Sequence, residues 1–288
     1  MNFIFKRRNE IGIKKFSEED ERKIVEEYIR GVPVSKLIEK YGFKTKKSII
    51  DKVKKYYPNN YKQLIDTAKN NRKNYSINLS KIDNEFNAYF LGLMLSDGYI
   101  QDDTKFGIQL TDKDCIEFIS KVTGKQYKEY DSKNEKHLKQ YRIIFSDKQQ
   151  VKNMIRLGVV KNKSCILKPP NLNEDEKKYI PYIIRGVIDG DGCIYTTSKG
   201  SVGFYICSMS YDFIIWIKMI LEEKLFMDDI HVKTGNKGIW LAETTLQRNI
   251  FKLISLVYDK PYGMQRKYTK LRETFRDYNL GNQDFLLG

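Results

Sequence analysis

The sequence predicts an α+β protein with two pseudo-symmetric repeats, preceded by a small all-α domain that resembles a helix-turn-helix. Two similar apolar segments each end in Asp-Gly, and the same order of strand-like and helix-like patterns follows each of them. A short, highly charged helical segment comes before both. The predicted division is 1–57 for the N-terminal domain, 58–82 for a linker, 83–178 for the first repeat, and 179–288 for the second repeat with a C-terminal tail.

The N-terminal domain is predicted to contain three helices. Ser17 is a good N-cap, and the acidic residues after it suit the positive end of the first helix. A second helix ends at Gly42, and the third is basic and carries Lys46 and Lys47. This outline is typical of a helix-turn-helix, in which Lys46 and Lys47 would contact DNA. A plain three-helix packing module has the same outline, so both interpretations stay open.

The two repeats match element by element. Each begins with an apolar helix containing a central glycine and ending in Asp-Gly, and strand-like alternation and amphipathic helices follow. Each half is therefore predicted as helix, two strands, helix, two strands, helix. The paired segments are 89–100 with 182–195, 105–111 with 201–208, 114–119 with 212–217, 140–145 with 238–242, and 149–157 with 246–257.

The glycines and aspartates of the two apolar helices predict a site. Gly92 and Gly186 each cost about 1 kcal/mol in a helix interior, which makes sense where two helix backbones approach closely. Such packing would bring Asp97 and Asp191 together at the helix ends. Two carboxylates that close repel each other unless a divalent cation lies between them. Asp-Gly is also a common turn, but two copies at repeat spacing favour a metal site.

Segments 90–98 and 184–192 resemble the nine-residue motif of LAGLIDADG homing endonucleases of the two-repeat, single-chain type. The resemblance covers about 83–275, roughly two thirds of the chain. The first copy departs from the motif at Leu95, where an acidic residue is usual. The next residue, Ser96, is not predicted to bind the metal. The second copy has Arg185 in place of a small apolar residue, which we expect to be a surface charge or a DNA contact.

The resemblance implies that an antiparallel sheet from each half enters the major groove, where a β-ribbon can reach base edges. Alternation within the strands then indicates which side chains face the DNA, although any solvated sheet face shows the same pattern. The predicted DNA-binding residues of the sheets are Lys105, Gln109, Thr111, Gln140, Arg142, Tyr205, Cys207, His231 and Lys233.

For catalysis, the resemblance implies Mg²⁺ or Mn²⁺ held by Asp97 and Asp191 at two scissile phosphates. Similar proteins place a lysine and a glutamine near each cut. Here Gln109 matches the glutamine of the first half, while Lys163 and Lys267 match the lysines, with solvated surface charge as the alternative for both. The predicted function is site-specific cleavage of double-stranded DNA at a long, asymmetric sequence.

Composition agrees with a nucleic-acid partner. Lys and Arg outnumber Asp and Glu by 52 to 37, a net charge of +15, which favours a polyanion. The chain has four cysteines without a CxxC pair and only two histidines, so chemistry must depend on carboxylates. The chain has no 18-residue apolar run and no signal sequence, so we expect an intracellular protein without membrane contact. We also expect it to act as a monomer.

A different class of function remains open on the same scaffold. The chain could be a maturase that binds intron RNA, or a DNA-binding regulator that does not cut. A pure binding protein has no need for the pair Asp97 and Asp191, so the pair favours the enzyme.

Overall fold

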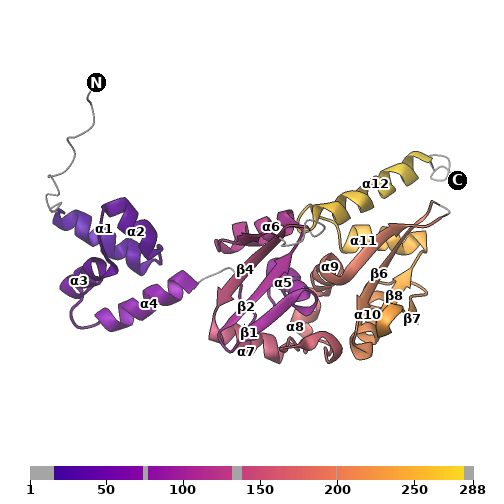
Figure 1. Cartoon of the computed structure of the whole chain (residues 1–288), viewed down its shortest axis with the longest axis horizontal. Helices are drawn as coiled ribbons and strands as arrows, with labels where there is room; N and C mark the ends of the chain where they lie inside the picture. The colour runs from indigo at the N-terminus through magenta and orange to yellow at the C-terminus, as the bar shows by residue number, and fades with distance from the viewer. Residues whose placement is uncertain (1–15, 74–76, 132–137, 199, 282–288) are drawn as a thin grey trace, which may run out of the picture. The chain divides into compact units, whose positions relative to one another are not determined.

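The structure is a computed structural model of the 288-residue chain, and it describes residues 16–73, 77–131, 138–198 and 200–281 (Figure 1). It contains two compact units, Met1–Asn74 and Tyr75–Gly288. In the described ranges, no helix is both long and apolar enough to cross a membrane.

The first unit is all-α. The three predicted helices are present as α1 (Glu18–Ile29), α2 (Val34–Tyr41) and α3 (Lys46–Tyr56). Ser17 and Asp20 form a capping box at the start of α1, and Gly42 ends α2 in the left-handed conformation, with φ 71°. A small core buries Ile24, Val25, Tyr28, Leu37, Ile49 and Val53.

The linker predicted over 58–82 is wrong for most of its length. Residues Tyr61–Lys73 form a fourth helix, α4, whose Ala68 is fully buried in the core of the first unit. Tyr61, Leu64 and Ile65 pack against the same core. These positions have the i, i+3, i+4, i+7 spacing of an amphipathic helix, but they are few and lie among many Asn and Lys residues.

The second unit contains the two repeats in the predicted order of elements. The first half consists of α5 (Glu85–Leu95), β1 (Gly98–Asp102), β2 (Lys105–Leu110), α6 (Lys113–Thr123), β3 (Lys128–Tyr130), β4 (Gln140–Ser146) and α7 (Lys148–Arg156). The second half consists of α9 (Ile180–Asp191), β5 (Gly192–Thr196), β6 (Val202–Ser208), α10 (Tyr211–Glu223), β7 (His231–Thr234), β8 (Trp240–Thr244) and α11 (Gln247–Leu256). Between the halves lie the short helices η1 (Lys163–Cys165) and α8 (Glu174–Lys177).

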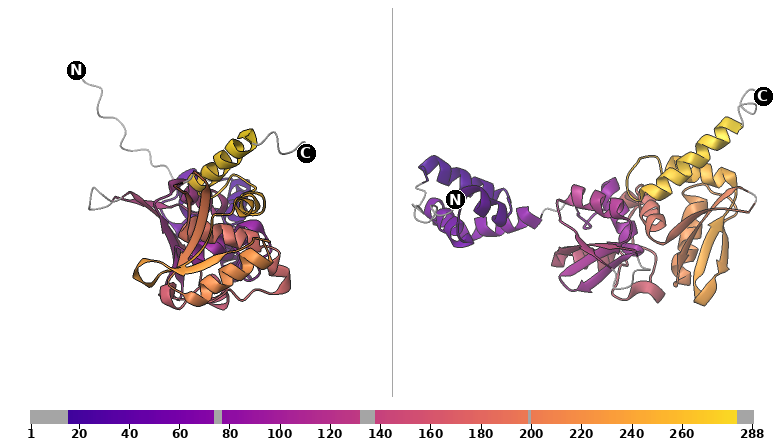
Figure 2. Two further views of the ribbon diagram at one scale, coloured as in Figure 1. Left: turned by 90° about the vertical axis from the view of Figure 1, so that its right-hand side faces the viewer. Right: turned by 45° about the horizontal axis from the view of Figure 1, so that its top comes forward.

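Each half has one four-stranded sheet in which all neighbouring strands are antiparallel. The strand orders, β1-β2-β4-β3 and β5-β6-β8-β7, are the same. Helices α5 and α9 lie side by side between the two sheets (Figure 1, Figure 2). The inner face of each sheet is buried in the core, as Phe106 and Phe145 are in the first half and Phe204 and Ile206 in the second. The α+β fold with two pseudo-symmetric repeats is therefore confirmed.

The C-terminal tail contains a helix that the sequence analysis did not predict, α12 (Gln265–Gly281). Its start is tied to the first half by Asp114, which accepts a hydrogen bond from the backbone N–H of Gln265 at 2.6 Å. Arg266 forms an ion pair with Asp112 at 2.6 Å. The end of the second half is thereby anchored to α6 of the first half.

Candidate functional site

Helices α5 and α9 touch backbone to backbone at the two predicted glycines. A Cβ atom on Gly92 would overlap the carbonyl oxygen of Ile183 and lie 2.8 Å from the Cα of Gly186. A Cβ atom on Gly186 would overlap the carbonyl oxygen of Tyr89 in the same way. The close approach predicted from the glycines is confirmed, and it brings the C-terminal ends of both helices together.

Asp97 and Asp191 lie at these adjoining ends. Asp191 is the last residue of α9, and Asp97 follows α5 by two residues. A Cβ atom on Gly190 would lie 3.1 Å from a carboxylate oxygen of Asp97, so the turn that carries Asp191 packs against Asp97. Both aspartates line one pocket of about 410 Å³, together with Leu95, Ser96, Lys163, Ser164, Leu167, Cys207, Ser208, Met209 and Ile239.

The surroundings of both carboxyls favour their protonated forms. Burial and then the charge of Asp97 raise the pKa of Asp191 to about 6. Asp97 is exposed at the mouth of the pocket, but enough protein surrounds its carboxyl that desolvation raises its pKa too, against the charges of Lys267 and Lys163. The two carboxylates therefore repel each other, as the sequence analysis anticipated for a pair that shares a cation.

The donor set of the pocket suits a hard divalent cation. In the part of the chain that the structure describes, no group of three or more Asp, Glu, His or Cys side chains could hold a metal ion. A zinc site needs three or four such ligands, whereas Mg²⁺ is commonly held by one or two carboxylates, water and substrate phosphate. Asp97 and Asp191 fit the second pattern and would be the protein ligands of such an ion.

Lys163 places an ammonium group in this pocket. Its Nζ donates to the carbonyl oxygen of Gly98 at 2.5 Å, and the described residues supply no second acceptor. Burial lowers the pKa of Lys163, while the charges of Asp191 and then Asp97 oppose that shift. Because an ammonium has three donors, two N–H groups of Lys163 remain for a ligand.

Lys267 is placed differently. It is 3% exposed on α12, and its Nζ donates to the carbonyl oxygens of Ile188, Asp189 and Gly192 at 2.5, 2.6 and 2.7 Å. These bonds use all three of its N–H groups. Lys267 does not line the pocket and instead satisfies the free carbonyls at the end of α9. Lys267 is therefore bound to the end of α9, next to Asp191.

Gln109 and Cys207 occupy equivalent places in the two sheets. Gly98 pairs with Ile108, and Gly192 pairs with Ile206, so each of the two residues lies one step further along, opposite an aspartate. Cys207 lines the pocket, and its Sγ donates to the carbonyl oxygen of Asp191 at 3.1 Å. Gln109 does not line the pocket and is bound to Arg142 and Gln140.

All residues predicted to bind DNA from the sheets lie on the sheet faces that point away from the core or just beyond them. Lys105, Thr111, His231 and Lys233 are exposed, while Gln109, Gln140, Arg142, Tyr205 and Cys207 are half-buried.

In the first unit, Lys46 and Lys47 are exposed at the start of α3. Two other lysines of this helix are engaged within the unit, because Lys52 and Lys55 both form ion pairs with Glu21 of α1. The exposed positive charge of α3 is therefore concentrated at its N-terminal end and at Lys54.

Arg185 is neither a surface charge nor a DNA contact, so that prediction is wrong. The residue is fully buried, with its guanidinium 3.7 Å from the centre of the Tyr262 ring and a hydrogen bond to the carbonyl oxygen of Lys260 at 2.7 Å. These contacts with the segment before α12 offset the free-energy cost of removing the guanidinium charge from water. Arg185 thus holds that segment against α9.

Asp189 is a buried residue that the sequence analysis missed. Its carboxylate accepts hydrogen bonds from the hydroxyls of Tyr89 and Tyr258, both at 2.7 Å, and from the backbone N–H of Met264 at 3.1 Å. Tyr89 belongs to the first half, so Asp189 joins both halves to the C-terminal segment. The signal was the first acidic residue of Asp189-Gly-Asp191, at the position where the first motif copy has Leu95.

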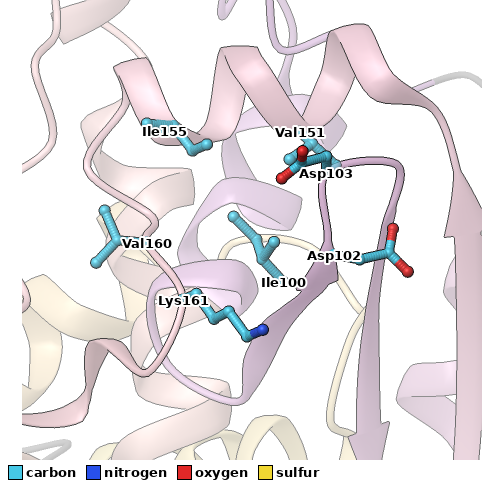
Figure 3. A pocket seen from close by; sticks show the side chains of 7 residues that line it. All are labelled: Ile100, Asp102, Asp103, Val151, Ile155, Val160 and Lys161. Carbon is cyan, nitrogen blue, oxygen red and sulfur yellow. The ribbon is translucent and has the colours of Figure 1, made fainter.

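A second pocket, of about 470 Å³, lies in the first half between the β1–β2 turn and α7 (Figure 3). Its lining is mostly aliphatic, with Ile100, Val151, Ile155 and Val160, and Asp102, Asp103 and Lys161 lie at its edge (Figure 3). None of the predicted site residues lines it.

No protein-family model matches the chain, and no curated protein matches its sequence. Similar solved structures include the LAGLIDADG meganuclease I-AabMI bound to uncleaved DNA, at 15% identity and a TM-score of 0.47, covering 70% of this chain and 92% of that one. The homing endonuclease I-WcaI bound to its DNA recognition sequence is similar at 16% identity and a TM-score of 0.49, over 65% and 87%. Full-length DUF199/WhiA from Thermatoga maritima is similar at 11% identity and a TM-score of 0.44, over 67% and 60%.

Proposed function

We propose that this chain is a metal-dependent endonuclease that cuts double-stranded DNA at a long, asymmetric site. The observation that carries the proposal is the pair Asp97 and Asp191, placed in one pocket by two helices that touch at Gly92 and Gly186. Lys163 adds two unused N–H donors to that pocket. The net charge of +15 supports a polyanionic substrate.

In this proposal the side chains of the pocket prepare a phosphodiester for hydrolysis. Asp97 and Asp191 would hold Mg²⁺ or Mn²⁺, which when bound supplies Lewis-acid stabilisation of phosphate charge and an activated water. Lys163 donates to a phosphate oxygen and stabilises the negative charge that develops there. Lys267 fixes the end of α9 through three carbonyls and thereby fixes the direction of Asp191.

The sheets would supply the affinity and the recognition. An antiparallel ribbon fits the major groove, where each base pair presents a distinct pattern of donors and acceptors. The exposed Lys105, His231 and Lys233 would contact phosphates, and half-buried side chains such as Arg142 would contact base edges. Because the outer residues of the two sheets differ, the recognised DNA sequence would not be palindromic.

A DNA-binding regulator is the second candidate, and an observation in the second half favours it. There the position of Gln109 is taken by Cys207, a weak donor, and all three donors of Lys267 are engaged by backbone carbonyls. A chain that only binds DNA would tolerate both features.

The test begins by selecting duplexes from a randomised pool with the full-length chain in Ca²⁺ and then adding Mg²⁺ to the selected duplex. We expect cleavage of both strands by the wild type. The double variant Asp97→Asn/Asp191→Asn should bind the duplex and leave it intact. Asp103→Asn, an exposed aspartate outside the pocket, is the matched control and should cut normally.

Three outcomes count against this proposal. Specific binding without cleavage in either Mg²⁺ or Mn²⁺ would favour the regulator. Wild-type cleavage by the double variant would remove the two aspartates from the active site. Tighter selection of structured RNA than of duplex DNA from a mixed pool would favour a maturase.

A further inference from the structure

Arg142 is held in a fixed position on the outer face of the first sheet. It pairs directly with Gln109 across β4 and β2, and its Nε donates to Oε1 of Gln109 at 2.5 Å. The amide nitrogen of Gln109 in turn donates to Gln140. The guanidinium lies 4.5 Å from the centre of the Tyr130 ring, which supports it from β3. Arg142 is therefore restrained by Gln109 and Tyr130, and Gln140 holds Gln109 in place, before any ligand binds.

These contacts leave the outer end of the guanidinium available. The bond to Gln109 uses Nε, and in the described part of the chain the two η nitrogens have no acceptor. Two η nitrogens without an acceptor form a planar fork of N–H donors. In the major groove the O6 and N7 atoms of guanine are the pair of acceptors that such a fork matches, and this is the commonest specific contact of arginine.

The second half has an apolar group at the equivalent positions. Cys207 corresponds to Gln109, because each lies opposite the aspartate of its half, and Cys207 pairs with Leu241 as Gln109 pairs with Arg142. Ile239 lies two residues before Leu241, as Gln140 lies two residues before Arg142, so both are on the same side. The polar group Gln109, Arg142 and Gln140 is thus replaced by Cys207, Leu241 and Ile239.

The charge of the neighbouring Lys233 is balanced within the second sheet. Lys233 of β7 pairs with Leu241 of β8 and forms an ion pair with Glu243 at 2.5 Å. Tyr205 and Tyr195 lie further along the same face, with ring centres 5.8 Å apart. A surface of thiol, aliphatic and aromatic side chains matches the one apolar feature of the major groove, the methyl group of thymine.

We propose that Arg142 reads a guanine in the first half-site, and that Cys207, Leu241 and Ile239 select thymine at the corresponding position of the second half-site. Both groups neighbour the aspartate pair, so the two bases lie on the inner sides of the half-sites, next to the cuts. This inference rests on the proposed binding of duplex DNA and names the bases that the two sheets prefer.

The experiment is selection of bound duplexes from a randomised pool, followed by sequencing, with the full-length Asp97→Asn/Asp191→Asn variant so that bound DNA stays intact. We expect a motif with guanine at one inner position and thymine at the matching position of the other half. Replacing the guanine should weaken binding about 5- to 150-fold, the range that one bidentate contact contributes. A pool with no enriched motif would overturn the proposed function itself.

Variants made in the same background separate the base reader from general charge. Arg142→Lys keeps the charge but loses the fork, so it should lose the preference for guanine and keep most of the affinity. The triple variant Gln109→Cys/Arg142→Leu/Gln140→Ile places the second group in the first half and should change guanine to thymine. Lys105→Ala, on the same sheet face, is the control and should weaken binding and its salt dependence without changing the motif.

An enriched motif with the same base at both inner positions would overturn the inference while leaving sequence-specific binding established. Retention of guanine by both Arg142→Lys and the triple variant would do the same. Circular dichroism and thermal melting of each variant show that it is folded, and Arg142→Lys, which changes little volume, carries the test if the triple variant is unstable.

Discussion

The ammonium of Lys267 donates a hydrogen bond to the carbonyl oxygen of Gly192, 2.7 Å away, across the end of helix α9. With its bonds to Ile188 and Asp189, this engages every donor of Lys267. Among the residues that the structure describes, Lys163 finds one such acceptor, the carbonyl oxygen of Gly98. Two lysines with the same predicted role therefore have different surroundings, one capping a helix and the other facing the pocket.

The two lysines should respond differently to substitution. Lys163→Ala removes the proposed donor to the phosphate, so the cleavage rate should fall about 100- to 1,000-fold with little change in thermal stability. Lys267→Met leaves buried carbonyls without donors and should reduce the free energy of unfolding by about 1–3 kcal/mol. Single-turnover cleavage and urea unfolding measure the two effects. An unstable Lys163→Ala variant, or a fully stable Lys267→Met variant, would contradict this division.

The contact between α5 and α9 should not tolerate a methyl group. Gly92→Ala and Gly186→Ala each place a Cβ atom against backbone of the other helix, so the helices must separate. We expect each variant to lose about 3 kcal/mol or more of stability, beyond the 1–3 kcal/mol of ordinary overpacking. Lys121→Ala, an exposed position on α6, should change stability by less than about 0.5 kcal/mol. Equal melting temperatures for all three variants would rule out the close contact.

The fold and the centre of the site could be predicted because contiguous residues carry them. The apolar helix, its glycine and its terminal aspartate form one short segment, and a second copy doubles the signal. The strands could be assigned because alternation of buried and exposed positions is a local property, as Phe106 and Gln109 show in β2.

What could not be predicted depends on the path of the chain between elements. Lys267 lies in a stretch rich in Lys and Arg, and only the route of the segment before α12 brings it, and not Arg266, onto the end of α9. Arg185 and Asp189 are charged residues buried in α9, and their partners Tyr258 and Tyr262 come about 70 residues later. Contacts between residues so far apart in the sequence produce no periodic pattern from which they could be predicted.

The first unit should lose stability in acid through Glu21. Its ion pairs with Lys52 and Lys55 lower the pKa of Glu21 to about 2, from an ordinary value of 4.5. A lowered pKa means that the stabilisation is present above pH 4.5 and is lost as the pH falls from 4.5 towards 2. Glu21→Gln should therefore destabilise the unit at pH 7 and make little difference near pH 2.

The measurement is urea unfolding of the full-length chain at several pH values, followed by amide NMR signals of α1. Tryptophan fluorescence serves as the internal control, because Trp216 and Trp240, the two tryptophans of the chain, both belong to the second unit. A difference between wild type and Glu21→Gln that stays constant from pH 7 to 2 would contradict the assignment.

The two strands of the substrate should be cut at different rates. The register that places Gln109 and Cys207 opposite the two aspartates gives only the first half an amide at that place, and a thiol is a weak donor that cannot position water or phosphate as well. Lys163 also has N–H groups left for a ligand, whereas the three N–H groups of Lys267 are bound to backbone carbonyls. We expect nicked plasmid to accumulate early in a time course on a plasmid with one site.

Gln109→Ala should slow one strand more than the other, and Cys207→Ala should have the smaller effect. Equal strand rates without a nicked species, together with an unaffected Gln109→Ala variant, would show that the asymmetry of the structure does not reach the chemistry.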